Sequence, residues 1–487
     1  MLTIRFVPPA DDGLASEALA VGVAPGGELL PAARAADAGG LVTRALAGRH
    51  RFDGDEDDVL PVLTASGWLV LVGMGAAEER DARRLRRIGG NLFAELADSG
   101  IICLDLRLDL APESAAELAY GMCLRAWRPA ARYRSKPDPD EEWSLVEAVL
   151  ATADPAAAQV RFDQLAAVAV ASAWARDLVV APANELNPDS FCRRLDSLAD
   201  LGVRVEQVDP RQTGLNLLQA VGQGSAVAPR LALLRWQGGR PDEPPVVFVG
   251  KGITFDTGGI DIKPREDMEE MKGDMAGAAA AAGAIHALAA RRAPINAVGV
   301  LAIAENMPSG RAARPGDVVK SYAGITVEIV DTDAEGRLAL ADALAFAAAT
   351  LRPALMVDLA TLTGAVEVSL GRHRAGLFTA DDALAKALFS AGEAEDEPVW
   401  RLPLTDAYDE ALESAAADLR NCTWEHSPDA LNAARFLQHF VPHEVPWAHL
   451  DIAGVSEAEE DGPLAAEGPT GFGIRLLVHL VEDRRAG

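Results

Sequence analysis

The chain has 487 residues, and its 45 Lys and Arg against 73 Asp and Glu give a formal net charge of −28. This length allows two or three domains, and two are natural for an α/β enzyme. The acidity disfavours a general polyanion-binding role, so we expect no nucleic-acid partner.

The first 160 residues alternate strand-like and helix-like segments, which predicts a smaller N-terminal α/β domain over 1–160. This region has no cluster of Asp, Glu, His or Cys at ligand spacing, so we assign it no catalytic part. A charged, proline-rich stretch at 132–141 predicts an exposed loop. The expected strands are Trp68–Val72 and Ile101–Leu106, and the expected helices are Arg80–Ala97 and Pro112–Ala126.

An apolar helical run over 161–182 is expected to link this domain to a larger catalytic domain over 183–487. Asn187 can cap a helix that has Pro188 in its first turn, and Gly202 suits the end of that helix. Strand-like runs then alternate with helices, which predicts a central, mostly parallel or mixed sheet of about eight strands flanked by helices. The expected strands are 203–208, 231–236, 246–249, 295–304, 325–330, 355–359 and 449–452.

A glycine-rich stretch, Val249–Asp274, carries charged side chains between an apolar strand and an alanine-rich helix, Ala276–Ala290. Open α/β sheets place their ligands at such strand ends. A second acidic stretch, Asp331–Leu338, follows the strand-like segment at 325–330 in the same way. Two strand ends with carboxylates predict one shared site.

Four carboxylates in one buried pocket would be prohibitive without compensation, and two divalent cations would cancel their charge. Asp333 and Glu335 lie two residues apart, so in an extended segment both would face the same metal pair. Oxygen donors with few imidazoles suit Mn or Zn, with Mg or Co as alternatives. Taken singly, each acid is more typical of a structural role, such as a helix cap. The four acids are Asp256, Asp274, Asp333 and Glu335.

Three basic side chains near these acids have separable roles. Metal ions depress the pKa of a neighbouring amine, so Lys251 could be a neutral ligand. Lys263 would remain an ammonium that polarises a carbonyl or holds a developing oxyanion. The planar fork of Arg337 suits a small anion such as bicarbonate or a carboxylate. Salt bridges for the lysines, and a surface position for Arg337, are the structural alternatives.

Six segments together resemble the cytosol (leucyl) aminopeptidase family of dinuclear metallopeptidases, from about residue 175 to residue 477: GKGITFDTGG, IKP, MKGDM, ENMPSGRAARPGD, DTDAEGRLALADAL and DLATLTGA. In the N-terminal third the likeness is only general. The resemblance implies a homohexamer that removes N-terminal residues from peptides with a free N-terminus. It also implies a hydroxide bridging two metals as nucleophile, with a bicarbonate as general base.

The resemblance implies a role for individual residues as well. Lys263 would polarise the substrate carbonyl, and Arg337 would hold the bicarbonate. The tighter metal would be bound by Lys251, Asp256, Asp274 and Glu335, and the more exchangeable one by Asp256, Asp333 and Glu335. The family's side-chain pocket matches Met271, Thr361 and Gly364, for which core packing and a turn remain open.

Three departures from the family pattern bear on the site. Asp331 stands where asparagine is usual, which adds a fifth carboxylate near the metals. Thr257 replaces a serine. Residues 421–430 replace a glycine-rich loop, and Trp424 and His426 within them could reshape the pocket.

Other functional classes are weaker alternatives. Pro245 and Gly252 break the spacing of a phosphate-binding loop, and Gly222–Ser225 lacks the spacing of a nucleophile elbow. Some relatives bind DNA, a role that the acidity disfavours. An inactive scaffold is disfavoured because every expected metal ligand is present.

The cysteines and the N-terminal residues bear on the cellular compartment in which the protein is expected. The four cysteines stand far apart without a C-x-x-C pair, which is typical of isolated thiols in a reducing compartment. Residues 1–13 lack the basic stretch and apolar core of an export signal, and no run reaches the roughly 18 apolar residues of a membrane span. We expect a cytoplasmic protein with no membrane segment.

Overall fold

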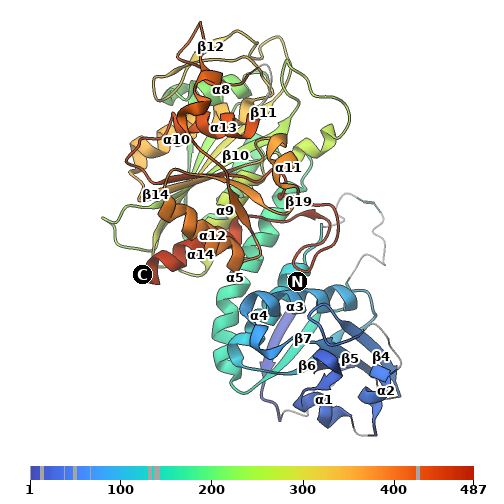
Figure 1. The fold of residues 1–487 in the computed structure, drawn as a ribbon. Helices are drawn as coiled ribbons and strands as arrows, with labels where there is room; N and C mark the ends of the chain where they lie inside the picture. Colours follow the sequence, from blue (N-terminus) through green and yellow to red (C-terminus); the bar gives the residue numbers. More distant parts are fainter. Residues whose placement is uncertain are drawn as a thin grey trace. The chain divides into compact units, whose positions relative to one another are not determined.

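The computed structural model describes residues 2–10, 16–37, 39–47, 52–65, 67–129, 134–135, 143–423 and 428–486. Most of the loop expected at 132–141 lies outside the described residues, as do Trp424 and His426. The chain divides into two compact units: residues 1–173 with 458–468, and residues 174–457 with 469–487. Both units combine a sheet with helices, which confirms the predicted two-domain α/β class (Figure 1).

The first unit is built on a seven-stranded sheet in the order β1-β7-β6-β2-β5-β4, with β3 beside β2. All of its expected strands and helices are present, with ends shifted by a few residues. The strands are β1 (Thr3–Val7), β2 (Ala18–Ala24), β3 (Glu28–Leu29), β4 (Val59–Thr64), β5 (Gly67–Gly73), β6 (Cys103–Leu110) and β7 (Glu147–Thr152). The helices are α1 (Pro31–Ala36), α2 (Leu41–Ala47), α3 (Ala82–Leu96) and α4 (Pro112–Arg125).

The helix α5 (Pro155–Val179) occupies most of the region where a linking helix over 161–182 is expected. It begins earlier because Asp154 accepts a hydrogen bond from the Ala157 N–H at 3.0 Å and Pro155 suits a first turn. The two units divide within this helix, between residues 173 and 174. The expected limits 1–160 and 183–487 stay a prediction.

The second unit contains an eight-stranded mixed sheet in the order β16-β15-β18-β14-β10-β11-β9-β8. The central strand β10 (Val246–Asp256) runs parallel to both neighbours, β11 (Asn296–Asn306) and β14 (Leu355–Ala360). This arrangement confirms the predicted sheet. The other strands are β8 (Arg204–Val208), β9 (Arg230–Gln237), β15 (Ala375–Phe378), β16 (Val399–Arg401) and β18 (Trp447–Asp451).

The strand expected at 325–330 does not belong to this sheet. The structure has a shorter strand there, β13 (Thr326–Glu328), which pairs with β12 (Val318–Lys320) and β17 (Leu419–Arg420) in a separate three-stranded sheet. The run ends early because the Val330 N–H donates to the side chain of Asn421 at 2.8 Å instead of to a strand. A further short pair is formed by β19 (Glu457–Ala458) and β20 (Gly468–Pro469).

The predicted helix cap at Asn187 is confirmed. Its side chain accepts a hydrogen bond from the Ser190 N–H, and the Ser190 hydroxyl accepts one from the Asn187 N–H. The helix α6 (Pro188–Leu195) is shorter than expected, because a 3₁₀ helix follows it and ends at Gly202 in the left-handed conformation (φ 89°).

Helices cover both faces of the eight-stranded sheet (Figure 1). On one face α9 (Ala276–Ala290) packs on β10, β11 and β14, and α14 (Ile474–Ala486) packs on α9. On the other face α10 (Glu335–Leu351) packs on β10 and β11. None of the described helices is long and apolar enough to span a membrane. The remaining helices are α7 (Pro210–Thr213), α8 (Asn216–Gly222), α11 (Gly364–Leu370), α12 (Asp382–Ala394) and α13 (Asp429–Gln438).

The alanine-rich composition of α9 lets it lie close to the sheet. A Cβ atom on Gly277, in its first turn, would meet the backbone oxygen of Leu359 at 2.1 Å. The Leu359 oxygen belongs to the strand backbone and the Cβ would be attached to the helix backbone, so neither can move without disturbing the packing. The approach positions the start of α9 beside the end of β14.

We predict that Gly277→Ala lowers the free energy of unfolding by about 1–3 kcal/mol through overpacking, despite a gain of about 1 kcal/mol in helix propensity. Chemical denaturation measures the change. Gly310→Ala is the matched control, because a Cβ there meets nothing within 4 Å. Equal stability of the two variants would contradict this account of the packing.

Candidate metal centre

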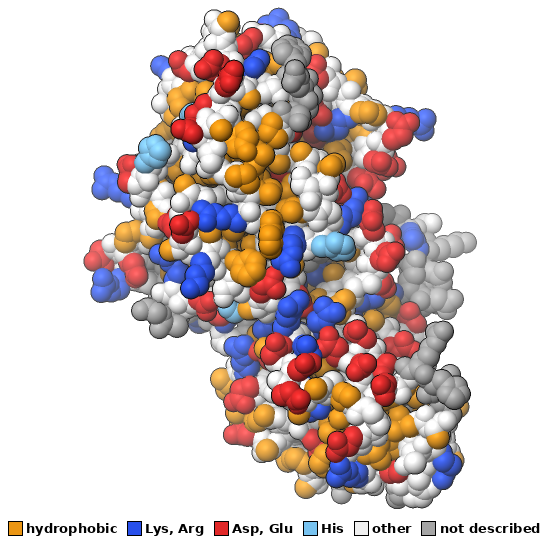
Figure 2. Space-filling model, viewed as in Figure 1, with side chains coloured by type: hydrophobic (Ala, Val, Ile, Leu, Met, Phe, Trp, Pro, Cys, Tyr) orange, Lys and Arg blue, Asp and Glu red, His pale blue; other side chains and the backbone are white. Residues whose placement is uncertain are grey.

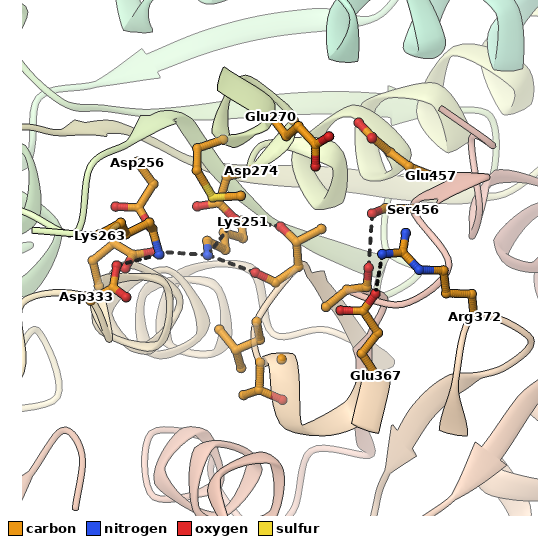
Figure 3. Close-up of a pocket in the computed structure, with 18 residues that line it drawn as sticks. Lys251, Asp256, Lys263, Glu270, Asp274, Asp333, Glu367, Arg372, Ser456 and Glu457 are labelled. Atoms are coloured by element: carbon orange, nitrogen blue, oxygen red, sulfur yellow. Dashed lines mark hydrogen bonds and ion pairs between the residues drawn. The ribbon is translucent and has the colours of Figure 1, made fainter. Parts of the chain in front are cut away.

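The two acidic segments meet in one pocket of about 280 Å³ in the second unit (Figure 3). It opens where the central strand β10 ends and α10 begins. Arg337 is not among the described residues that line it. The lining includes nine of the ten residues expected at the site: Lys251, Asp256, Lys263, Met271, Asp274, Asp333, Glu335, Thr361 and Gly364.

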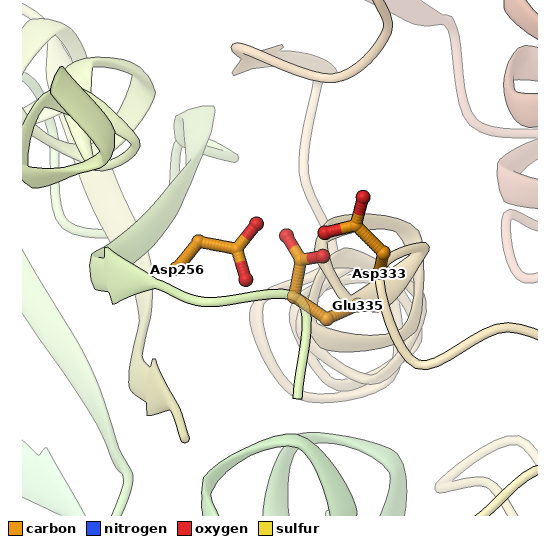
Figure 4. A group of neighbouring side chains, drawn as sticks. All are labelled: Asp256, Asp333 and Glu335. Atoms are coloured by element: carbon orange, nitrogen blue, oxygen red, sulfur yellow. The ribbon is translucent and has the colours of Figure 1, made fainter. Parts of the chain in front are cut away.

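Three of the carboxylates converge on one point. Asp256, Asp333 and Glu335 each offer an oxygen, and these oxygens lie within 4.8 Å of one another (Figure 4). The fourth carboxylate, Asp274, lies across Lys251 from Glu335. All four predicted acids therefore border one cavity.

The two lysines lie between the acids. Lys251 Nζ is 2.8 Å from Asp274 Oδ1 and 2.9 Å from Glu335 Oε1, and it donates to the Thr361 carbonyl at 2.8 Å. Lys263 Nζ is 3.0 Å from Asp256 Oδ2 and 2.5 Å from Asp333 Oδ1. The ammonium groups occupy the positions where compensating positive charge is needed.

The four carboxylates outnumber the two lysines, and burial together with this excess of negative charge shifts the pKa values of the side chains at the site. Burial, together with the charges of Asp256 and Glu335, raises the pKa of Asp333 to about 7 against the opposing effect of Lys263. Burial also raises the pKa of Asp274 and of Glu335. Burial alone would lower the pKa of Lys251, but the neighbouring carboxylates outweigh it and raise that pKa. A divalent cation among these groups would lower the pKa of each of them.

The donor set fits a divalent metal. Asp274 Oδ2 and Glu335 Oε2 are buried and have no hydrogen-bond partner among the described residues. A buried carboxylate oxygen without a partner is costly, and such groups call for an ion or another ligand. Carboxylate oxygens with one amine nitrogen suit Mn, Mg or Zn.

Asp256 is oriented by a residue that the charge pattern does not reveal. Its Oδ1 accepts hydrogen bonds from Asn306 Nδ2 at 2.8 Å and from the Gly258 N–H at 2.9 Å, so Oδ2 is left to face the pocket. Asn306 is the last residue of the neighbouring strand β11. Its position at a strand end is the signal that could have identified it.

A second overlooked residue joins the two acidic segments. The Thr332 hydroxyl donates to the Gly258 carbonyl at 2.6 Å and accepts from the Asp261 N–H at 2.9 Å. The Thr332 N–H in turn donates to Asp261 Oδ2 at 2.8 Å. Thr332 is buried, so these bonds fix the loop after β10 against the loop before α10.

The extended conformation expected for 333–335 is wrong, although both side chains line the pocket. Asp331 Oδ1 accepts a hydrogen bond from the Asp333 N–H at 2.8 Å and closes a turn, and Glu335 is the first residue of α10. The helix N-terminus favours a carboxylate there. Asp331, expected as a fifth carboxylate near the metals, does not line the pocket.

The helix-cap alternative for Asp274 is also wrong. The helix α9 begins at Ala276, and its N-cap residue is Met275. Asp274 Oδ1 instead accepts a hydrogen bond from the Thr361 hydroxyl at 2.7 Å. Its side chain serves the pocket and not the helix.

Gly336 follows Glu335 for a steric reason. A Cβ atom there would lie 2.7 Å from Lys251 Cε and 2.8 Å from Lys251 Nζ. The Lys251 side chain passes directly over this backbone to reach the two acids. Glycine at 336 therefore allows the lysine to enter the carboxylate cluster.

Arg337 is buried, so the surface alternative for it is wrong. Its Nη1 donates to the Asn421 carbonyl at 3.0 Å and its Nη2 to Asp429 Oδ1 at 2.8 Å. Its Nε has no hydrogen-bond partner among the described residues. Thr257, the other departure, donates through its hydroxyl to the Asn306 carbonyl at 2.8 Å and keeps a structural role.

We predict that Thr332→Val weakens Mn²⁺ binding by roughly tenfold to hundredfold, as is usual when a residue supporting metal ligands is lost. The substitution keeps the shape but removes the hydroxyl that joins the two loops. Isothermal titration calorimetry measures the affinity. Thr350→Val, on the exposed side of α10, should bind Mn²⁺ like the wild type. Unchanged affinity in Thr332→Val would show that the two loops are held by other contacts.

Comparison with known families gives matches over most of the chain. The catalytic domain of the cytosol aminopeptidase family matches residues 173–478, and the N-terminal domain of the same family matches residues 20–137. The likeness therefore extends into the N-terminal third, beyond the range that the motifs indicate.

Individual relatives agree with the family match. A probable cytosol aminopeptidase of Caulobacter vibrioides is 43% identical over 497 residues, with 100% of both chains covered. One of Rhizobium etli is 43% identical over 461 residues, with 92% of each covered.

Two solved structures share the fold. A tomato leucine aminopeptidase mutant superposes with a TM-score of 0.87 at 29% identity, covering 99% of this chain and 96% of the other. The bottromycin maturation enzyme BotP in complex with Mn has a TM-score of 0.84 at 35% identity, covering 96% of this chain and 100% of the other. Because these matches include the whole carboxylate pocket, the chain belongs to the cytosol aminopeptidase family and is a metal-dependent aminopeptidase.

Proposed function

We propose that the enzyme removes the N-terminal residue of peptides at a centre of two divalent metal ions. The observation that carries this proposal is the cluster of Asp256, Asp333 and Glu335, whose oxygens lie within 4.8 Å of one another beside Lys251 and Asp274. When bound, the ion pair supplies a hydroxide nucleophile at neutral pH and polarises the substrate carbonyl.

The ligands divide between the two ions. Asp256 and Glu335 would hold both ions, and Asp333 would hold the more exchangeable one. The tighter site adds Lys251 and Asp274. The orphaned oxygens Asp274 Oδ2 and Glu335 Oε2 support this division. The ions are Mn or Zn in this proposal, with Mg or Co as alternatives, and BotP supports Mn as a structural relative in complex with that metal.

Lys263 acts on the substrate carbonyl. Its ammonium is partly exposed at the pocket between Asp256 and Asp333, and those carboxylates raise its pKa although burial opposes them. A persistent positive charge can stabilise the oxyanion that develops on the carbonyl oxygen.

The size of the pocket suits removal of a single residue. Its volume of about 280 Å³ is near the lower end for small-molecule sites, which span roughly 300–1,000 Å³. Met271 and Thr361 line it, and a side chain on Gly364 would project into open space, because a Cβ there meets nothing within 4 Å. We assign these three residues to the binding of the substrate side chain.

Arg337 holds a bicarbonate that serves as general base in this proposal. Its unpartnered Nε supports the assignment, whereas Asn421 and Asp429 already occupy the two Nη groups. Bound at Arg337, the anion would supply a general base to the reaction.

A homohexamer and a cytoplasmic location complete the proposal. The support is the family resemblance and the name of the relatives, probable cytosol aminopeptidases. Acidic and basic side chains are interspersed over the visible face of each unit (Figure 2), which gives no support to nucleic-acid binding.

We predict that metal-free enzyme is inactive on leucine amide and regains activity with Mn²⁺ or Zn²⁺. Asp333→Asn should lower kcat/KM by more than about a hundredfold, since a metal ligand matters at least as much as the groups that support it. Asp331→Asn is the matched control, because an amide oxygen can still accept the Asp333 N–H. Steady-state kinetics with Mn²⁺, Zn²⁺, Mg²⁺ or Co²⁺ added to the metal-free enzyme checks both variants.

Normal turnover by Asp333→Asn would remove this residue from the metal centre. Full loss of activity in both variants, with the fold retained, would place the essential feature in the turn at 331–333 instead.

A further inference from the structure

The pocket continues past Asp274 along a wall whose carboxylates have no role in the proposed function. This wall is formed by the 3₁₀ helix Met268–Gly273 and by the segment that carries Ser456 and Glu457. Met271 provides an apolar surface on it. Glu270 and Glu457 add two carboxylates (Figure 3).

The Glu457 carboxylate lies close to the backbone that precedes Asp274. Its Oε1 lies 3.0 Å from the position of a Cβ atom on Gly273, the residue before Asp274. Glu270 is close enough to act on it electrostatically. Neither carboxylate has an ion pair or side-chain hydrogen bond with the residues that the structure describes.

Nearby basic groups do not neutralise this pair. Arg372 lines the same pocket, but its Nη2 pairs with Glu367 at 2.9 Å. Burial raises the pKa of Glu457, and Glu270 raises it further, against the weaker effects of Lys272 and Arg372. Because Arg372 is paired with Glu367, Glu270 and Glu457 leave the wall with a net negative charge.

The metal end of the same pocket carries a buried carboxylate oxygen that calls for a ligand. Asp274 is 8% exposed, and its Oδ2 has no partner among the described residues. The metal end and the Glu457 end are thus two separate polar regions, joined by the Met271 surface. A ligand with a polar group at each end and an apolar stem between them matches this order.

We propose that Glu457 and Glu270 select peptides whose N-terminal residue is lysine or arginine, an inference that rests on the proposed aminopeptidase function. The substrate amine and carbonyl lie at the metal end. The methylene stem passes along Met271, and the terminal cation meets the two carboxylates. A leucine side chain would instead leave the partly buried Glu457 without a partner.

The test compares lysine amide with norleucine amide, which has the same straight four-carbon stem without the terminal amine. We expect Mn²⁺-loaded wild type to prefer lysine amide. Glu457→Gln should lower kcat/KM for lysine amide by roughly tenfold to hundredfold, mainly through KM, because a charge-assisted hydrogen bond is lost. The kcat/KM of this variant for norleucine amide should stay the same or rise. Glu269→Gln, on the same 3₁₀ helix but outside the pocket lining, should change neither value.

Two results would overturn the inference while leaving the aminopeptidase proposal intact. One is a wild type that hydrolyses norleucine amide at least as well as lysine amide, with a ratio that Glu457→Gln leaves unchanged. The other is an equal loss on both substrates with less Mn²⁺ bound, which would make the pair part of a metal site. Failure of the metal-loaded wild type to hydrolyse either amide would overturn both proposals.

Discussion

The concentration of four carboxylates at the end of the central strand is the constraint on which the site depends. Two lysines lie between these acids, yet the pKa of Asp333 still rises to about 7. Such a cluster persists only where surrounding structure holds the acids together against their repulsion. The hydrogen bonds of Thr332 to Gly258 and Asp261 provide part of that structure, because they tie the two acid-bearing loops to each other.

The sheet and the helices packed on it position the carboxylate cluster. β10 ends at Asp256, and its neighbour β11 ends at Asn306, which orients that carboxylate. Glycines permit the close approaches: one lets α9 lie on the end of β14, and Gly336 lets Lys251 cross the start of α10. The positions of the acids therefore follow from backbone packing more than from local sequence.

Much of this arrangement can be predicted from sequence. Alternating apolar runs identify the strands, and the spacing of glycine, lysine and acid identifies the charged residues of the pocket. Its other expected residues, Met271, Thr361 and Gly364, follow from the family resemblance. Local geometry is harder, because tertiary contacts decide it. The segment at 325–330 is strand-like, but Asn421 captures the Val330 N–H and the chain turns instead. Neutral partners such as Thr332 and Asn306 carry no charge signal, so they emerge only when segments distant in sequence are brought together.

The most direct measurement is a crystal structure of the enzyme grown with Mn²⁺ and phased by the anomalous signal of manganese. The account predicts two peaks roughly 3.5–4 Å apart, both in contact with Asp256 and Glu335 and one of them beside Lys251. Peaks that lie elsewhere, or a Lys251 ammonium that still bridges Asp274 and Glu335 at saturating Mn²⁺, would contradict it.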